Sequence, residues 1–257
     1  MASETLVRLR RTATLRQKPA GGDPPRRDVP PNRLLAALPA DDCDRIFPLL
    51  RTVPMRYKQV LQRQDEPVSC VYFPASGVAS LTTMMRDGRT VEVATVGNEG
   101  MIGIWPALGG RVAASEAIVQ VPGGSAQAMP VELFRKELAR RGGLHDVVTR
   151  YVQAFLLLTM QSAACNGLHT VEQRCCRWLL MAHDRTGRDE FRLTQETLAV
   201  MLGVRRPSVT DVAGALRDSG RIDYRSGRVR IVDRKRLEAA SCECYRVIRS
   251  HFRRLLN

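Results

Sequence analysis

The sequence of 257 residues predicts an α+β fold, with strands in its first half and helices in its second. Three patterns carry this prediction. Short apolar runs separated by turn residues occupy residues 53–121, which is typical of a small β-barrel or roll. An apolar heptad pattern from Leu144 to Cys165 predicts a long helix. Two short amphipathic helices then precede a hairpin pattern between Leu193 and Val232.

Domain boundaries are predicted where composition and periodicity change. Residues 1–32 are rich in Arg, Pro and Gly and lack apolar periodicity, so we expect a disordered basic tail. The units that follow are a β-roll, a dimerisation helix and a C-terminal domain, predicted over residues 33–143, 144–167 and 168–257.

The predicted roll opens with two short helices and continues as strands. The helices are expected over residues 34–38 and 41–47, and Pro48 should end the second. The strands are expected over Val68–Phe73, Val78–Met84, Val91–Val96 and Ala117–Val121. The Asp-Gly pair at residues 87–88 tolerates the positive φ angles of a tight hairpin, so the second and third strands should be neighbours.

The long helix carries a seam of residues at alternating spacings of four and three. The seam consists of Leu144, Val148, Tyr151, Phe155, Leu158, Ser162 and Cys165. Val152 and Leu156 lie outside the seam and are expected to rest on the roll. Two interpretations are open, a coiled-coil dimer seam and a fully buried core helix. We favour the dimer, because the motif described next functions in pairs.

Two amphipathic helices hinged at Gly203 follow, after a further helix expected over residues 170–182. Thr194 is a suitable N-cap for the first, and a glycine such as Gly203 ends a helix in a left-handed conformation. Pro207 is tolerated in the first turn of the second helix. The buried stripe of the second helix is Val209, Val212, Ala213 and Leu216. Its outer face is small and polar, which suits the major groove of DNA.

Residues 222–232 contain two short runs around Ser226 and Gly227 and are predicted to form a hairpin. Helix, turn, helix and basic hairpin together are typical of a winged helix-turn-helix. The residues expected to contact DNA are Thr194, Gln195, Arg205, Arg206, Ser208, Thr210, Asp211, Arg225 and Arg228.

The alternative interpretation of this motif is a surface helical hairpin. The distribution of charge favours the DNA-binding interpretation. Residues 1–33 carry a formal charge of +5 and residues 168–257 carry +8, whereas residues 34–167 carry only +1. Positive charge concentrated in the segment with the motif is what phosphate contacts require.

From the composition we expect a cytoplasmic protein. No apolar run approaches the length of a membrane span, and the charged N-terminus lacks the apolar core of a signal peptide. The seven cysteines are irregularly spaced, which argues against a secreted disulfide framework. His183 and Asp184 are adjacent, but no nucleophile motif accompanies them, so we do not expect an enzyme.

The order of these elements resembles the catabolite-activator and fumarate-nitrate-regulator (Crp/Fnr) family of bacterial transcription factors. The resemblance covers about residues 34–240 and is strongest over residues 71–103 and 193–231. It implies a sequence-specific, dimeric regulator with a cyclic-nucleotide-binding-like sensor domain and paired winged helices. The implied partners are double-stranded DNA, a second copy of the chain, RNA polymerase and an effector of unknown identity. No resident cofactor is expected.

The sequence departs from the members of that family that bind cyclic AMP. Those members carry a Gly-Glu-Leu stretch, whose glutamate holds the ribose, and an Arg-Ser or Arg-Ala pair, whose arginine neutralises the phosphate. Here the stretches read Gly103-Ile-Trp and Ala113-Ala-Ser-Glu, and Arg111 is out of register. A buried phosphate without a cation is costly, so we expect no cyclic AMP binding. The weakly defined effector pocket comprises Gly97, Gly100, Gly103, Arg111 and Ser115.

The second helix of the motif also departs from the resemblance. Arg206 matches a base-reading arginine of the family, while Pro207 and Asp211 stand where a glutamate and a later arginine occur. Arginine pairs with guanine and aspartate accepts from cytosine, so the preferred DNA sequence should differ from that of the catabolite activator.

A thiol- or metal-responsive regulator is the alternative function. Its candidate residues are Cys165, Cys175, Cys176, Cys242 and Cys244, with His169. Cys242-Glu-Cys244 lacks the two-residue gap usual at zinc sites, and Cys175 and Cys176 lie on different helix faces. Buried apolar cysteine is the ordinary role, so no metal site is predicted. Cys43 and Cys70 are isolated, which argues against an iron–sulfur cluster.

Overall fold

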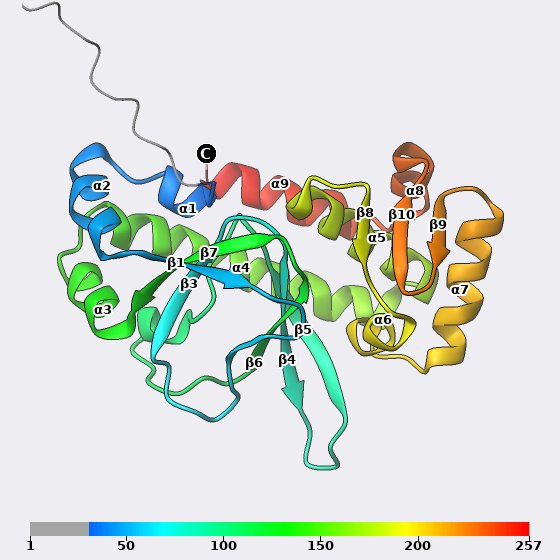
Figure 1. Ribbon diagram of the computed structural model, residues 1–257, viewed down its shortest axis with the longest axis horizontal. Coiled ribbons are helices and arrows are strands. Elements are labelled where there is room, and N and C mark those ends of the chain that lie inside the picture. Colours follow the sequence, from blue (N-terminus) through cyan, green and yellow to red (C-terminus); the bar gives the residue numbers. More distant parts are fainter. Residues whose placement is uncertain (1–30, 257) are drawn as a thin grey trace, which may run out of the picture.

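The computed structural model describes residues 31–256, so most of the predicted basic tail lies outside the described residues. Figure 1 shows the strands of a β-roll at one end and a smaller helical domain at the other. Two helices, α4 (Gly143–Leu168) and α9 (Cys244–Leu256), run between these ends. Within the described residues, no helix combines the length and the apolar character that crossing a membrane requires.

Asn32, the last residue of the predicted tail, has a structural role in the roll. Asn32 is buried, and its side-chain oxygen accepts hydrogen bonds from the backbone N–H groups of Leu34 and Leu35. Its side-chain amide donates to the carbonyls of Pro74 at 3.0 Å and Gly100 at 2.8 Å. Asn32 therefore caps the first helix and ties it to the roll, so it does not belong to the tail.

The roll is made of two antiparallel sheets. Its helical elements are α1 (Arg33–Ala36), α2 (Ala40–Ile46), η1 (Phe47–Leu49), η2 (Trp105–Leu108) and α3 (Val131–Ala139). Its strands are β1 (Arg51–Met55), β2 (Val60–Gln62), β3 (Cys70–Pro74), β4 (Val78–Met84), β5 (Thr90–Val96), β6 (Glu116–Val121) and β7 (Gly124–Pro130). The strand orders are β1-β7-β3 and β2-β6-β4-β5. The predicted hairpin at residues 87–88 joins β4 to β5.

Strand β7 and helix α3 were not predicted. The sequence of β7, Gly-Ser-Ala-Gln-Ala-Met-Pro, is poor in the β-branched and aromatic residues that favour strands. Its backbone is extended because it pairs with β1 on one side and β3 on the other. Gly123, just before it, packs against the backbone of Gly77 so closely that a Cβ atom would lie 2.2 Å from the nitrogen of Gly77.

The C-terminal domain contains the predicted helical motif and its hairpin. Its elements are α5 (Val171–Thr186), β8 (Glu190–Arg192), α6 (Gln195–Leu202), α7 (Arg206–Asp218), β9 (Ile222–Arg225), β10 (Arg228–Ile231) and α8 (Arg234–Ala240). Strand β8 was not predicted, and it completes a three-stranded sheet of order β8-β10-β9. Thr170 caps α5 through a reciprocal capping box with Gln173, as the helix predicted from residue 170 requires.

The seam predicted along α4 faces the chain's own core, which contradicts its assignment to a dimer interface. Leu144, Val148, Tyr151, Leu158, Ser162 and Cys165 are all buried within the single chain, and Phe155 is partly buried. The Tyr151 hydroxyl donates to the carbonyl of Met101 at 3.0 Å, and its ring lies 6.5 Å from that of Phe252 on α9. The roll and α9 therefore occupy the face that a partner helix would need.

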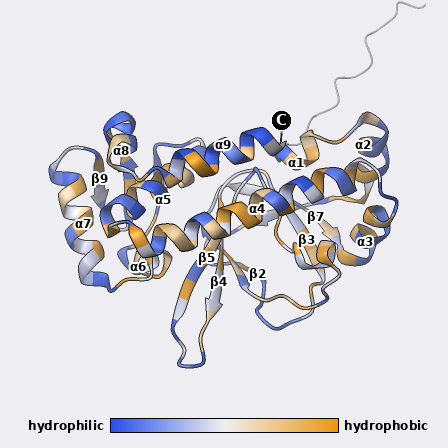
Figure 2. Cartoon of the chain, turned by 180° about the vertical axis from the view of Figure 1, so that it is seen from behind, coloured by the Kyte–Doolittle hydropathy of each residue, from blue (hydrophilic) through white to orange (hydrophobic). Residues whose placement is uncertain are grey.

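The opposite face of α4 is the one that remains exposed. Leu156 is 58% exposed and Met160 is 62% exposed, although Leu156 was expected to rest on the roll. Figure 2 shows α4 crossing the molecule with apolar residues along its visible face. The alternating residue spacing of four and three correctly predicted a buried stripe along α4. The exposed apolar residues of α4 form a separate stripe on its other face.

Candidate nucleic-acid interface and sensor pocket

The helix-turn-helix is built from local signals that the sequence carries. Thr194 Oγ1 accepts the backbone N–H of Thr197 at 3.1 Å and begins α6. Gly203 ends α6 with a φ of +62°, a left-handed conformation that glycine adopts without strain. The chain then turns into α7, where Arg206 is the first helical residue and Pro207 the second. These signals determine where α6 ends and where α7 begins.

Helix α7 presents a polar face to solvent. Val209, Ala213 and Leu216 are buried, whereas Arg205, Arg206, Pro207, Thr210, Asp211 and Ala215 are exposed and Ser208 is partly buried. The Thr210 hydroxyl donates to the side-chain oxygen of Gln195 at 3.0 Å and so links the outer faces of α7 and α6. Within residues 31–256, neither Arg205 nor Arg206 forms an ion pair, so both guanidinium groups are available to an anionic partner.

The hairpin predicted after α7 is a wing beside α6. Ser226 and Gly227 both have positive φ angles, 49° and 71°, as a two-residue turn matching the twist of its strands requires. A groove of about 440 Å³ lies between this turn and the start of α6, lined in part by Thr194, Gln195 and Arg206. Three of the predicted DNA-contacting residues thus meet in one place.

The arginines of the wing are engaged in surface ion pairs. Arg225 lies 3.0 Å from Asp223, and Arg228 lies 3.1 Å from Glu190 on the unpredicted strand β8. Exposed pairs of this kind contribute about 0–1 kcal/mol to stability, so exchange of a carboxylate for a phosphate costs little. Both arginines remain suited to contacts with the DNA backbone.

The roll contains a cavity of about 250 Å³ beneath α4. Gly103 and Ser115 line it, as expected of effector-pocket residues. The other three residues assigned to that pocket lie elsewhere. Gly97 packs against the side chain of Arg185, Gly100 packs against the ring of Tyr151, and Arg111 is exposed. The two glycines are needed for packing, and Arg111 is on the surface.

The lining of this cavity is mainly apolar. It comprises Gln62, Leu81, Thr83, Val93, Met101, Gly103, Ile104, Trp105, Ala114, Ser115, Phe155 and Thr159, none of which is charged. The buried side-chain oxygen of Gln62 has no hydrogen-bond partner among the described residues, while its amide donates to the carbonyl of Ser115 at 3.0 Å. Such an orphaned acceptor is costly unless a ligand or a water donates to it.

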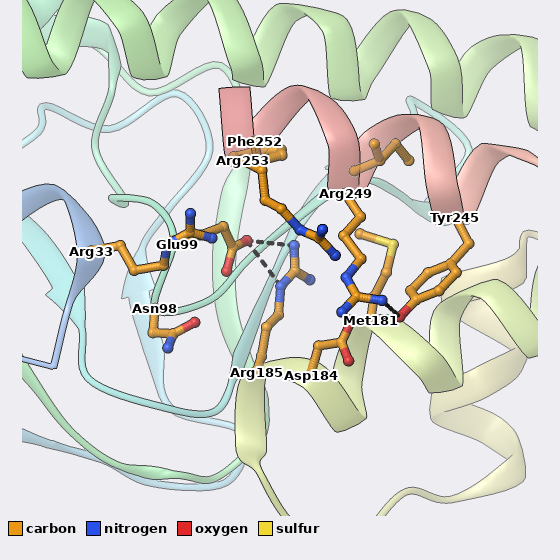
Figure 3. Close-up of a pocket in the computed structure, with 11 residues that line it drawn as sticks. Arg33, Asn98, Glu99, Met181, Asp184, Arg185, Tyr245, Arg249, Phe252 and Arg253 are labelled. Carbon is orange, nitrogen blue, oxygen red and sulfur yellow. Dashed lines mark hydrogen bonds and ion pairs between the residues drawn. The ribbon is translucent and has the colours of Figure 1, made fainter. Parts of the chain in front are cut away.

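A buried ion pair joins the roll to the C-terminal domain, and sequence reasoning missed it. Arg185 of α5 reaches Glu99 in the turn after β5, with a shortest N–O distance of 2.6 Å, and both side chains are at least 90% buried. Arg185 also donates to the hydroxyl of Thr95 at 2.6 Å and to its carbonyl at 3.2 Å. Figure 3 shows the two side chains facing each other below α9.

Glu92 of β5 forms a second contact between the same two domains. Its carboxylate accepts hydrogen bonds from the indole N–H of Trp178 at 3.0 Å and from the hydroxyl of Ser80. Burial disfavours the ionised form and raises the pKa of Glu92 to about 7, although both hydrogen bonds oppose the shift. Neither interdomain contact has a local sequence signal, because each partner lies more than 80 residues from the other.

The cysteines of the alternative function separate into two groups. Cys175 and Cys176 are buried in α5, and burial raises the pKa of both thiols, that of Cys176 to about 12, so they are unreactive at neutral pH. Cys165, Cys242 and Cys244 instead converge with His169 at the end of α4. His183 contacts Asp189 at 2.8 Å and the guanidinium of Arg234.

Comparison with family profiles identifies both halves of the chain. Residues 53–141 match the cyclic nucleotide-binding domain, and residues 173–240 match the Crp-like helix-turn-helix domain. No curated protein matches the sequence significantly.

Solved structures with the same fold have low sequence identity. A transcriptional regulator of the CRP family from Thermus thermophilus is 21% identical, with a TM-score of 0.60 over 74% of this chain and 96% of that one. A regulator of the crp/fnr family from Eubacterium rectale is 17% identical, with a TM-score of 0.62 over 80% and 96%. The c-di-GMP-responsive regulator CLP from Xanthomonas campestris is 17% identical, with a TM-score of 0.60 over 75% and 99%.

Proposed function

This chain belongs to the Crp/Fnr family of transcriptional regulators, and on that premise we propose that it reads DNA as a dimer with α7 in the major groove. The observation that carries the proposal is the position of Arg206. Its guanidinium lies at the exposed start of α7, beside the wing and without an ion-pair partner in the described chain. We place its action in the cytoplasm, with double-stranded DNA and RNA polymerase as partners.

Arg206 and Arg228 are expected to contribute differently to binding. Arg206→Ala should remove a contact to a guanine edge, which costs about 1–3 kcal/mol and relaxes the preference at one position of each half-site. Arg228→Ala should remove a phosphate contact, which weakens all sequences alike and lowers the salt slope by about one unit. The measurement is binding of both variants to single-base operator variants at several salt concentrations.

Arg217→Ala is the matched control, because Arg217 is an exposed arginine near the far end of the same helix and pairs with Asp218. It should leave the base preference unchanged. If Arg206→Ala lowers affinity equally for every sequence, Arg206 only positions the helix, and Ser208, Thr210 and Asp211 must read the bases.

We propose that two chains pair along the exposed face of α4. Leu156 and Met160 lie one helical turn apart on this face, and Val152 precedes them by one more turn. Large apolar side chains at such spacing on a long helix are typical of a helix–helix contact. Phe155 and Thr159, their neighbours in sequence, line the cavity of the roll. A ligand in the cavity would therefore contact the helix that forms the dimer.

The effector is proposed to be a small, uncharged and largely apolar molecule. The cavity of about 250 Å³ has an uncharged and mainly apolar lining, to which Gln62 contributes. A cyclic phosphate would be buried there without a cation, which is strongly unfavourable.

Cyclic AMP is accordingly expected neither to bind nor to change DNA affinity. Calorimetry with cyclic AMP and cyclic GMP at up to millimolar concentrations tests this. Operator binding measured with and without each nucleotide provides the second readout. Heat consistent with micromolar binding would show that the nucleotide finds a cation in another conformation, and the proposed effector class would then be wrong.

A further inference from the structure

Four potential metal ligands from distant parts of the chain converge where α4 ends. Cys165 and His169 are one helical turn apart at the end of α4, Cys242 lies between α8 and α9, and Cys244 is the first residue of α9. Their ligand atoms all lie within 4.8 Å of one another. The Sγ atoms of Cys165 and Cys242 are 3.5 Å apart, as are the Sγ of Cys244 and the Nδ1 of His169.

We propose that Cys165, His169, Cys242 and Cys244 bind a single zinc ion. Three thiolates and one imidazole form a recognised ligand set of structural zinc sites. Zn–S bonds of about 2.3 Å and Zn–N bonds of about 2.0 Å place tetrahedral ligands about 3.5–3.8 Å apart. The two distances above already match that separation, so the remaining ligands need to move by about an ångström or less.

The geometry favours a single metal ion over an iron–sulfur cluster or a disulfide. An iron–sulfur cubane holds each ligand on a different iron, which requires a wider separation than these four atoms have. A disulfide between Cys165 and Cys242 would require the sulfurs to approach to about 2.05 Å. It would also leave Cys244 and His169 adjacent without a common partner. A single ion would instead use all four residues as ligands.

Groups around the four ligands are arranged as outer-sphere partners. The Nε2 of His169 lies 3.1 Å from the carboxylate of Glu243, so its Nδ1 is directed toward the thiols. A carboxylate that orients a ligating histidine in this way is a common feature of zinc sites. The side-chain amide of Gln161 donates to the Sγ of Cys244 at 3.0 Å, as expected for a hydrogen bond that stabilises a thiolate.

Buried positive charge beside the site supplies an independent argument. Arg174 and Arg177 of α5 are more than 90% buried, and neither forms an ion pair in residues 31–256. The Nε atom of each also lacks a hydrogen-bond partner among those residues. Arg177 lies close enough to Cys165 for an electrostatic interaction, and Arg174 lies close enough to Cys165 and Cys242. Zinc with three thiolates carries a net charge of −1, which would compensate cations that are otherwise expensive to bury.

The position of the site suggests what the ion does. Thr170, the residue after His169, caps α5, so the site lies at the junction between the long helix and the DNA-binding domain. Cys242 and Cys244 belong to the segment that leads from α8 into α9. The ion would therefore join the end of α4 to the far end of the DNA-binding domain and hold α7 at one orientation relative to the dimer helix.

The test is zinc content and affinity of the purified full-length protein, prepared under reducing conditions. We expect one zinc per chain by elemental analysis, and cobalt substitution should give the visible spectrum of a tetrahedral site with thiolate ligands. Removal of zinc with a chelator should lower the melting temperature by about 5–15 °C, because binding energy of the ion is folding energy. It should also weaken operator binding.

Variants assign the site to these residues. Cys165→Ser and Cys244→Ser should abolish zinc binding, whereas Cys70→Ser on β3 is the control and should retain it. Glu243→Gln changes an exposed residue and does not threaten folding. It should retain one zinc per chain but bind it about 10–100-fold more weakly.

Three outcomes would overturn the proposal. The first is a reduced, folded protein that takes up neither zinc nor cobalt. The second is equal zinc affinity in Cys244→Ser, Glu243→Gln and the Cys70→Ser control. The third is iron with acid-labile sulfide in protein purified without oxygen, which would identify a cluster instead. The zinc measurements involve no DNA, so their outcome does not depend on whether α7 reads the operator.

Discussion

Replacing Leu156 and Met160 together with lysine is expected to convert the protein into a folded monomer that no longer binds its operator tightly. Both side chains are mostly exposed in the single chain, so lysine is tolerated there without a buried charge. In a dimer the same positions would bring four like charges together. Loss of the second half-site should lower operator affinity by about 10²–10⁴-fold. Sedimentation and operator binding measure the two effects.

The buried stripe of the same helix provides the control. Leu158→Ala leaves the exposed face intact but removes a core side chain, which should cost about 2–5 kcal/mol of unfolding free energy. The Leu158 variant should therefore be less stable and still dimeric, and the double-lysine variant stable and monomeric. A double-lysine variant that remains a dimer would show that the chains pair through another surface.

Replacing Arg185 with methionine is expected to lower the free energy of unfolding more than any other single substitution at the contacts between the two domains. The Glu99 carboxylate would remain buried without its cation, and breaking a buried pair in this way costs about 3–5 kcal/mol. Arg185→Met together with Glu99→Gln removes both charges and should recover much of the loss. Unfolding in denaturant measures the coupling between the two positions.

The same pair should also link the sensor to the DNA-binding domain. Arg185 lies on α5 and its partners Glu99 and Thr95 lie on the roll, so the bond holds the two domains in one arrangement. Exposed Arg188, two residues beyond α5, supplies the control, since Arg188→Met should leave stability within about 0.5 kcal/mol of the original. A small loss in Arg185→Met, equal to that of the control, would mean that water or a rearranged side chain compensates Glu99.

Much of the fold follows from signals that act over a few residues. The cap at Thr194, the stop at Gly203 and the turn at Ser226 and Gly227 are determined by local backbone preferences, and the structure has all three as expected. Strand β4 covers the predicted residues, and α4 has the predicted extent to within a few residues. The family resemblance could be recognised because it rests on the order of such local elements.

The tertiary structure alone decided which side chains meet. Helix α4 is apolar on two sides. A residue spacing of four and three fits packing inside the same chain as well as packing against a second chain. Only the positions of α9 and the roll determine which face of α4 is covered. Cys165 and Cys242 are 77 residues apart, and Glu99 and Arg185 are 86 apart. No local preference relates positions at such separations. Their contact arises when the C-terminal domain folds back along α4, which places the proposed zinc ligands at one end of that helix and the buried ion pair against the roll.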